Sequence, residues 1–273
     1  NFLWTSVWLE TIFDKITGIP CLFSEIKDAA VSSQLDSIPK IKGFLVIQIV
    51  FINCTITIQE RNKFFMGKKI IIGSRGSKLA LIYAQIAKST IAQNTNLNNE
   101  DIIIKPITTS GDQVKDVRLS EVGGKGLFSK NIEIELQTKK IDLAVHALKD
   151  LPAQETNGLI TNIFLKRNDP REILVTGDKK KLNELKPNAI VGTSSFRREF
   201  QLKKKRKDLN YKLIRGNIDT RIKKLNEGLY DAIILSYAGI QSLKLSDQIS
   251  EIFSVKDLLP SAGQGIISLQ CRE

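Results

Sequence analysis

The sequence predicts an α/β protein with mostly parallel β-sheets. From about residue 68 onward, short apolar runs alternate with longer stretches in which apolar residues recur at helical spacing. Several of the apolar runs end in glycine, serine or arginine, residues that suit the turn from a strand into a helix. Alternation of strand and helix along the chain is the pattern that builds parallel sheets.

The first half of this region contains three expected strands and two expected helices. The apolar runs at 69–73, 101–107 and 141–146 predict strands. Residues 77–92 predict a helix because Leu79, Ile82, Ile86 and Ala87 lie near helical spacing. Residues 126–138 predict a second helix, whose apolar positions are Leu127, Ile132, Ile134 and Leu136.

The second half repeats the alternation. Apolar runs predict strands at 173–176, 189–192, 211–214 and 231–235, and a helix is expected at 220–227. The polar stretch 166–171 between the halves is the predicted hinge between two domains.

Residues 1–65 do not follow this pattern. The run 43–58 is strongly apolar, but Gln48 and Asn53 interrupt it, and it falls short of the roughly 20 apolar residues that a membrane span needs. Met66, the one methionine, directly precedes the first strand pattern. Our hypothesis is that Met66 is the natural start and that 1–65 is upstream read-through; the alternative is a targeting or anchoring segment.

The charge of the chain limits its partners. Its 41 lysines and arginines against 29 acidic residues give a net charge of +12, which suits nucleic acid, an anionic membrane or an acidic small molecule. The basic run 203–207 contains no aromatic residue, so an exposed helix end is favoured over a nucleic-acid patch. The three cysteines have no metal-site spacing and predict no disulfide framework, which favours a reducing, cytoplasmic location.

Two arginine clusters carry the strongest functional signal. Arg197 and Arg198 end the segment 191–198, and Arg215 and Arg221 bound the segment 215–221. Each cluster follows an apolar run and opens a helical stretch, where free backbone N–H groups and the helix dipole favour anions. Because a guanidinium group binds a carboxylate at two points, the two clusters predict a ligand with several negative groups.

Two glycine-rich turns give weaker signals. The turn 73–77 carries Arg75 and Ser77, and Ser77 suits an ordinary helix cap as well as an anion site. The loop 122–128 either places Lys125 and Phe128 near a ligand or is a flexible connection with Phe128 in the core.

The segment 146–152 ends a buried strand. His146, the one histidine, is more often a structural hydrogen-bonding residue than a base at such a place. Asp150 among many cations either stabilises a developing positive charge and moves a proton, or forms a salt bridge or a cap.

These motifs, together with the segment 259–265, resemble the hydroxymethylbilane synthase (porphobilinogen deaminase) family in order and spacing, from about residue 68 to Glu273. The resemblance implies a transferase of tetrapyrrole synthesis that joins four porphobilinogen units head to tail with loss of ammonia and releases hydroxymethylbilane. It implies Asp150 as the catalytic carboxylate beside the pyrrole N–H. It implies that the carboxylates of the dipyrromethane cofactor and the substrate are held by Arg75, Ser77, Lys149, Ser195, Arg197, Arg198, Arg215 and Arg221. It places Lys125, Phe128 and Gln264 at the substrate and its flanking loop.

The resemblance also implies a domain organisation. Two domains like those of periplasmic binding proteins are expected, 68–165 with a return of the chain at 266–273, and 171–259. The third, α+β domain with the cofactor-anchoring cysteine is expected to be missing, since Cys271 does not match the anchor, and the fragment is expected to be inactive alone. Ser242 stands where the family often carries a further arginine. A monomer without bound metal, nucleic acid or membrane is expected.

Two other classes of function remain open. A non-catalytic anion-binding module of the periplasmic type needs the arginines but does not need Asp150. A nucleic-acid binder would use residues 203–207, and its affinity would fall steeply with salt.

Overall fold

The computed structural model describes residues 69–95, 97–109, 111 and 126–273. The leader 1–65 and Lys125 therefore lie outside the described residues. Contacts along the backbone divide the chain into two compact units, residues 1–70 with 89–103 and residues 71–88 with 104–273. Apart from the first residue of β1 and the first two of β2, both sheets belong to the second unit.

The first sheet has five strands in the order β2-β1-β3-β10-β4. Its strands are β1 (Ile70–Arg75), β2 (Ile102–Ile107), β3 (Leu143–Ala147), β4 (Leu159–Phe164) and β10 (Ile267–Arg272). Strand β1 pairs with β3 in parallel, whereas β10 runs antiparallel between β3 and β4. This part of the chain includes the helices α4 (Lys78–Asn94) and α6 (Lys130–Gln137) and the short 3₁₀ turns η2 (Asn99–Asp101) and η3 (Leu148–Asp150).

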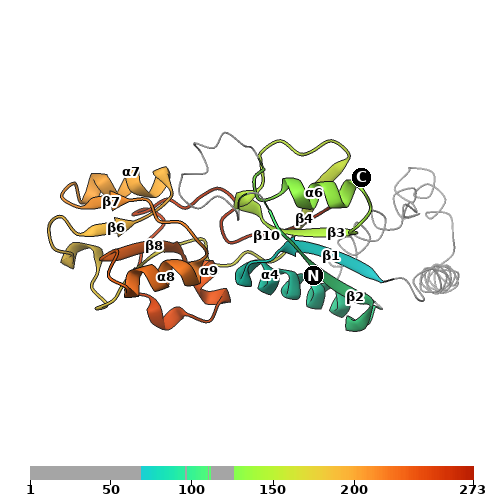
Figure 1. Ribbon diagram of the computed structural model, residues 1–273, viewed down its shortest axis with the longest axis horizontal. Helices are drawn as coiled ribbons and strands as arrows, with labels where there is room; N and C mark the ends of the chain where they lie inside the picture. Colours follow the sequence, from blue (N-terminus) through green and yellow to red (C-terminus); the bar gives the residue numbers. More distant parts are fainter. Residues whose placement is uncertain (1–68, 96, 110, 112–125) are drawn as a thin grey trace, which may run out of the picture. The chain divides into compact units, whose positions relative to one another are not determined.

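The second sheet also has five strands, in the order β7-β6-β8-β5-β9 (Figure 1). They are β5 (Glu172–Thr176), β6 (Ile190–Gly192), β7 (Asn210–Lys212), β8 (Ala232–Ser236) and β9 (Glu251–Ile252). Strand β6 is parallel to β7 and β8, and β5 is antiparallel to β8 and β9. The helices are α7 (Phe196–Lys205), α8 (Ile218–Asn226) and α9 (Tyr237–Ser242), with 3₁₀ turns η4 (Leu182–Glu184) and η5 (Ser246–Gln248).

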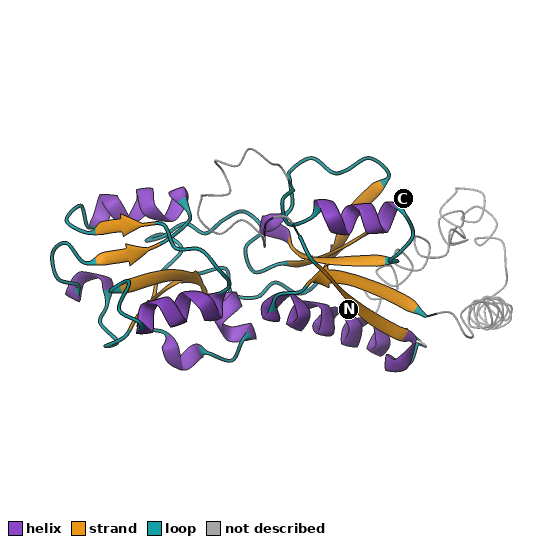
Figure 2. Cartoon of the chain, in the orientation of Figure 1, coloured by secondary structure: helices purple, strands orange, loops and turns teal. Residues whose placement is uncertain are grey.

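Helices cover both faces of the second sheet (Figure 2). Because successive strand residues point to opposite faces, Leu174 and Ile234 pack with Leu202 of α7. Their chain neighbours Ile173 and Ile233 form a separate cluster, which includes Leu225 of α8 and Ile240 of α9. Strands buried on both faces read as continuous apolar runs, which is why the sequence reveals them.

The predicted α/β class is confirmed, and each sheet combines parallel with antiparallel neighbours. The helix expected at 126–138 begins only at Lys130, because Gly126 adopts a left-handed φ of +71° and residues 126–129 form turns.

The prediction that Ile134 belongs to the apolar side of this helix is wrong, since 46% of its surface is exposed. Ile134 is two residues from both Ile132 and Leu136, about 200° around the helix axis, and therefore faces away from them. Glu133 is buried instead, where its carboxylate accepts hydrogen bonds from Thr156 Oγ1 and Gln270 Nε2.

Candidate functional site

A pocket of about 1000 Å³ in the second unit collects the predicted site residues. Parallel strands bring their carboxyl ends to one edge of a sheet, so the segments that follow β1, β3, β6 and β8 all reach such an edge. Every predicted cofactor, catalytic and loop residue except Lys125 lines this pocket: Arg75, Ser77, Phe128, Lys149, Asp150, Ser195, Arg197, Arg198, Arg215, Arg221 and Gln264.

Seven cationic side chains line the pocket, and we call it the cationic pocket: Arg75, Lys149, Arg197, Arg198, Arg215, Arg221 and Lys224. Among the described residues that line it, the one acidic side chain is that of Asp150. Such an excess of positive charge in one hollow suits a ligand that carries several carboxylates.

The cations of this pocket repel one another. Burial, followed by the charges of Arg198 and Arg215, lowers the pKa of Arg221 to about 10. Burial and the charge of Arg75 lower the pKa of Arg215, and burial lowers the pKa of Lys149. An anionic ligand would relieve this repulsion, because a nearby opposite charge favours the charged form of each cation.

Local structure orients the first arginine cluster. Ser195 is the N-cap of α7, where its hydroxyl accepts a hydrogen bond from the backbone N–H of Arg198 at 3.5 Å. Arg198 is buried and donates from Nη1 to the carbonyl of Ile234 at 3.0 Å. Arg197 and Arg198 both pair with Glu172 of β5.

The second cluster is shaped by a tight turn. Gly216 has a φ of +107°, and a side chain there would collide with Thr220, so the turn between Arg215 and α8 requires glycine. Arg221 Nε then donates to the carbonyl of Gly216 at 2.8 Å, which holds its side chain against the turn.

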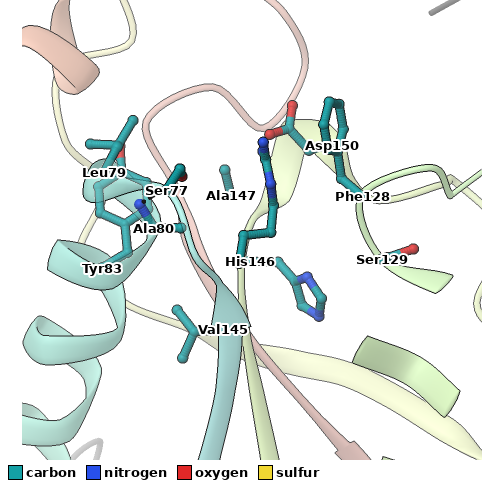
Figure 3. A pocket seen from close by; sticks show the side chains of 11 residues that line it. Ser77, Leu79, Ala80, Tyr83, Phe128, Ser129, Val145, His146, Ala147 and Asp150 are labelled. Carbon is teal, nitrogen blue, oxygen red and sulfur yellow. Dashed lines mark hydrogen bonds between the residues drawn. The ribbon is translucent and has the colours of Figure 1, made fainter. Parts of the chain in front are cut away.

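Asp150 is an exposed residue at the end of η3, directly after β3. It is close enough for its charge to act on Lys149, Arg221 and Tyr83. Figure 3 shows a smaller pocket that shares Asp150 and Phe128 with the cationic pocket: Leu79 and Tyr83 of α4 lie on one side of it, and Phe128 and Asp150 lie on the other. Phe128 also stacks with Arg75, whose guanidinium carbon is 4.0 Å from the ring centroid.

Gln264 lines the pocket and forms hydrogen bonds with residues of two different segments. Its side chain is 1% exposed, accepts from Lys149 Nζ at 3.4 Å and donates to the carbonyl of Pro170 at 2.7 Å. Its backbone carbonyl accepts from Arg167 Nε at 3.0 Å. Gln264 thereby ties Lys149 to the 166–171 segment that the sequence predicts as a hinge.

His146 forms a buried hydrogen-bonded network. Its Nε2 lies 3.1 Å from Gln270 Oε1, and Gln270 Nε2 donates to Glu133. Burial lowers the pKa of His146 from 6.5 to about 4, so the ring is neutral at pH 7. These contacts agree with the structural interpretation of this histidine.

The depressed pKa of His146 predicts a pH dependence of stability. The unfolded chain binds the proton near pH 6.5 and the folded chain only near pH 4, so the free energy of unfolding falls as pH is lowered across this window. His146→Gln should remove about 2–3 kcal/mol of that fall. Urea unfolding of both proteins at pH 7 and pH 4.5 checks this, and an equal fall in the two proteins would contradict it.

Lys224, Tyr83 and Asn217 are among the pocket residues that the sequence analysis does not predict as site residues. Lys224 lies on the face of α8 that also carries Asn217 and Arg221, at positions i, i+4 and i+7, so helical spacing would have revealed it. Tyr83, 8% exposed, is missed because an aromatic residue at helical spacing is usually core. Burial raises the pKa of Tyr83, and the side chain of Ser242 opposes that rise. The Ser242 hydroxyl donates a hydrogen bond to the carbonyl of Ala238 at 2.8 Å. Asn217 is the N-cap residue directly before α8.

The structure also shows the surroundings of the basic run 203–207 and of Cys271. In the basic run, Lys203, Lys205 and Arg206 pair with Glu199, Asp257 and Asp208. Cys271 is a free cysteine buried in β10. Within the described residues no group of three or more metal-ligating side chains occurs, and no helix is long and apolar enough to cross a bilayer.

The dipyrromethane cofactor that the resemblance implies can be tested against these residues. Arg198 lines the pocket and is buried, and its Nε has no hydrogen-bond partner within the part of the chain that the structure describes. A buried donor of this kind is costly unless a ligand satisfies it. The volume, the cations and this donor therefore fit a bound molecule with several carboxylates.

Comparison with known proteins identifies the family. Residues 70–273 match the family model described as "Porphobilinogen deaminase, dipyromethane cofactor binding domain". The chain is 44% identical over 207 residues to porphobilinogen deaminase of Chlorobium phaeovibrioides and 47% identical over 207 residues to that of Bacillus pumilus. These alignments cover 76% and 75% of this chain and 66% of each relative, so the chain spans just under two thirds of their length.

Among solved structures, a periplasmic substrate-binding protein of an ABC transporter from Coxiella burnetii aligns with 75% of this chain and 85% of its own. The identity is 13% and the TM-score is 0.46. The sequence relatives and the family model are the findings that decide the classification, and they confirm the predicted resemblance. The chain belongs to the porphobilinogen deaminase family.

Proposed function

We propose that this chain is the cofactor- and substrate-binding part of a transferase that joins four porphobilinogen units into hydroxymethylbilane with loss of ammonia. The observation that carries the proposal is the cationic pocket, in which seven cations surround one exposed carboxylate within a cofactor-binding domain of this family. Porphobilinogen bears an acetate and a propionate, so each added unit brings two more negative charges to such a pocket.

In this proposal the arginines bind the carboxylates of the cofactor and substrate and so orient both molecules. Arg75, Arg197, Arg198, Arg215 and Arg221, with Lys149, hold the carboxylates of cofactor and substrate, and Ser77 and Ser195 add hydroxyl donors. The dipyrromethane group supplies the pyrrole chain to which substrate units are added. Phe128 and Gln264 border the same space, and Lys125 of the preceding loop is proposed to act beside them.

Asp150 is the proposed catalytic residue. Departure of ammonia from the aminomethyl arm leaves positive charge on the pyrrole ring and its N–H. A fixed carboxylate stabilises that charge as it develops, because it is already in place before the reaction and needs no reorganisation. Asp150 suits this role because it is the acidic side chain among the described residues that line the pocket.

We further propose that the two sheets belong to two domains, 68–165 with 266–273 and 171–259. The support is that β1 to β4 and β10 form one sheet and β5 to β9 form the other. A cytoplasmic monomer that binds neither nucleic acid nor membrane completes the proposal.

The direct test is conversion of porphobilinogen by the complete protein that contains this sequence. We expect ammonia to be released and a linear tetrapyrrole to form in a ratio of four to one. Absence of both, in protein that is folded and carries its cofactor, would leave the anion-binding module as the better proposal. Salt-sensitive DNA binding by the same protein would support the nucleic-acid alternative.

A further inference from the structure

Glu172 is an acidic residue that the proposed chemistry does not use. It is the first residue of β5, and its side chain is completely buried, with 0% exposure. Its Oε2 accepts a hydrogen bond from Arg198 Nη2 at 2.7 Å, and its Oε1 accepts one from Arg197 Nη2. One carboxylate therefore bridges two neighbouring cations of the pocket.

The topology explains why an acid at the start of a strand reaches this edge. Strand β5 is antiparallel to β8, and Glu172 is the register partner of Ser236, the last residue of β8. The amino end of β5 thus lies beside the carboxyl end of β8, which is parallel to β6 and so ends at the same edge as Gly192. The arginine segment that follows β6 begins there.

Some of the other N–H groups of Arg197 and Arg198 donate to backbone carbonyls. Arg197 Nη1 donates to the carbonyl of Leu259, and Arg198 Nη1 donates to the carbonyl of Ile234. Within the described residues, Arg198 Nε has no hydrogen-bond partner. Both side chains still line the pocket, so their guanidinium groups border the space that a ligand would occupy.

We propose that Glu172 is a positioning residue of the cationic pocket: it fixes the guanidinium groups of Arg197 and Arg198 so that the N–H groups it leaves over bind a carboxylate of a pyrrole ligand. This inference rests on the proposed function, since it names the group that organises that site.

Because Glu172 is charged, the inference can be tested by whether its neutralisation strengthens or weakens the binding of an anion. Burial alone would raise the pKa of Glu172, but Arg198 and Arg197 hold it below its usual value, so the group is ionised at neutral pH. An ionised carboxylate reduces the positive potential that attracts an anionic ligand. If Glu172 did nothing but carry charge, its neutralisation would strengthen anion binding; if it positions the arginines, its neutralisation weakens anion binding.

The experiment uses the complete protein and a pyrrole that carries the acetate and propionate but has a methyl group in place of the aminomethyl arm, so that no ammonia can leave. Its affinity is measured by calorimetry for the wild type, Glu172→Gln, Glu172→Asp and the matched control Glu227→Gln. Glu227 is an exposed acid at the end of α8, 3.7 Å from Lys223, and its substitution changes the net charge by the same amount.

We expect Glu172→Gln to bind the pyrrole about tenfold or more weakly than the wild type, despite its extra positive charge. Glu172→Asp keeps the charge on a side chain one methylene shorter and should bind with intermediate affinity. Glu227→Gln should bind like the wild type. Thermal unfolding of each variant shows that the titrations are made below its melting temperature, and if Glu172→Gln does not fold, Glu172→Asp carries the test.

Unchanged or tighter binding by Glu172→Gln, or wild-type affinity in Glu172→Asp where the glutamine variant does not fold, would overturn the inference while leaving the proposed function intact. Failure of the wild type itself to bind the pyrrole would count against the proposed function. The two failures are therefore distinguishable.

Discussion

Replacing Asp150 with alanine is expected to abolish most of the turnover while ligand binding is retained. The carboxylate stands among cations that hold the ligand, but it is proposed to act on charge that appears only during the reaction. Removing one preorganised electrostatic group of this kind lowers kcat by about 10²–10³-fold. We therefore expect at least that loss for Asp150→Ala, measured as tetrapyrrole formation by the complete, cofactor-loaded protein.

Two further variants test whether the loss of turnover is caused by the missing charge and is specific to position 150. Asp150→Asn has nearly the same shape without the charge and should be as defective as the alanine variant. Asp247→Ala, at an acid of η5 that does not line the pocket, should turn over normally. Near-normal turnover in Asp150→Asn would show that the charge of this residue is not needed.

The second large effect is expected at the arginines. Arg197→Ala and Arg215→Ala should each weaken binding of the same methyl-substituted pyrrole by about 10–100-fold, because each removes a charge-assisted hydrogen bond in a partly buried site. Arg215 is half-buried and Arg197 is 27% exposed at its side chain, so water replaces neither contact fully.

The control for these variants is Lys203→Ala on α7. Lys203 pairs with Glu199 and does not line the pocket, but its loss changes the net charge as much as the loss of an arginine. It should bind the pyrrole with wild-type affinity. Equal affinities in all three variants would mean that overall charge, rather than these two side chains, attracts the ligand.

The fold could be predicted to the extent that its strands are buried on both faces. Ile173 to Val175 and Ile233 to Leu235 are continuous apolar runs because each sheet face is covered by helices. The limits of α6 could not be predicted, since they depend on the turn at Gly126 and on a buried Glu133 that only distant partners, Thr156 and Gln270, make acceptable.

The candidate site could be predicted where its residues directly follow a strand. The pocket-lining residues after β1, β3 and β6 could be predicted because parallel strands end at the same edge of their own sheet. Glu172 was missed because it is the first residue of an antiparallel strand, and its position beside the arginines depends on the order of strands in the sheet. Tyr83 was missed because an aromatic residue at helical spacing usually belongs to the core, and it is indeed 8% exposed although it also lines the pocket.

The most direct measurement of the central claim is a crystal structure of the complete protein with the methyl-substituted pyrrole bound. The account predicts carboxylate oxygens within hydrogen-bond distance of Arg197, Arg198 or Arg215 and a pyrrole N–H directed at Asp150. A pyrrole bound outside the cationic pocket, or bound within it with its N–H turned away from Asp150, would contradict the account.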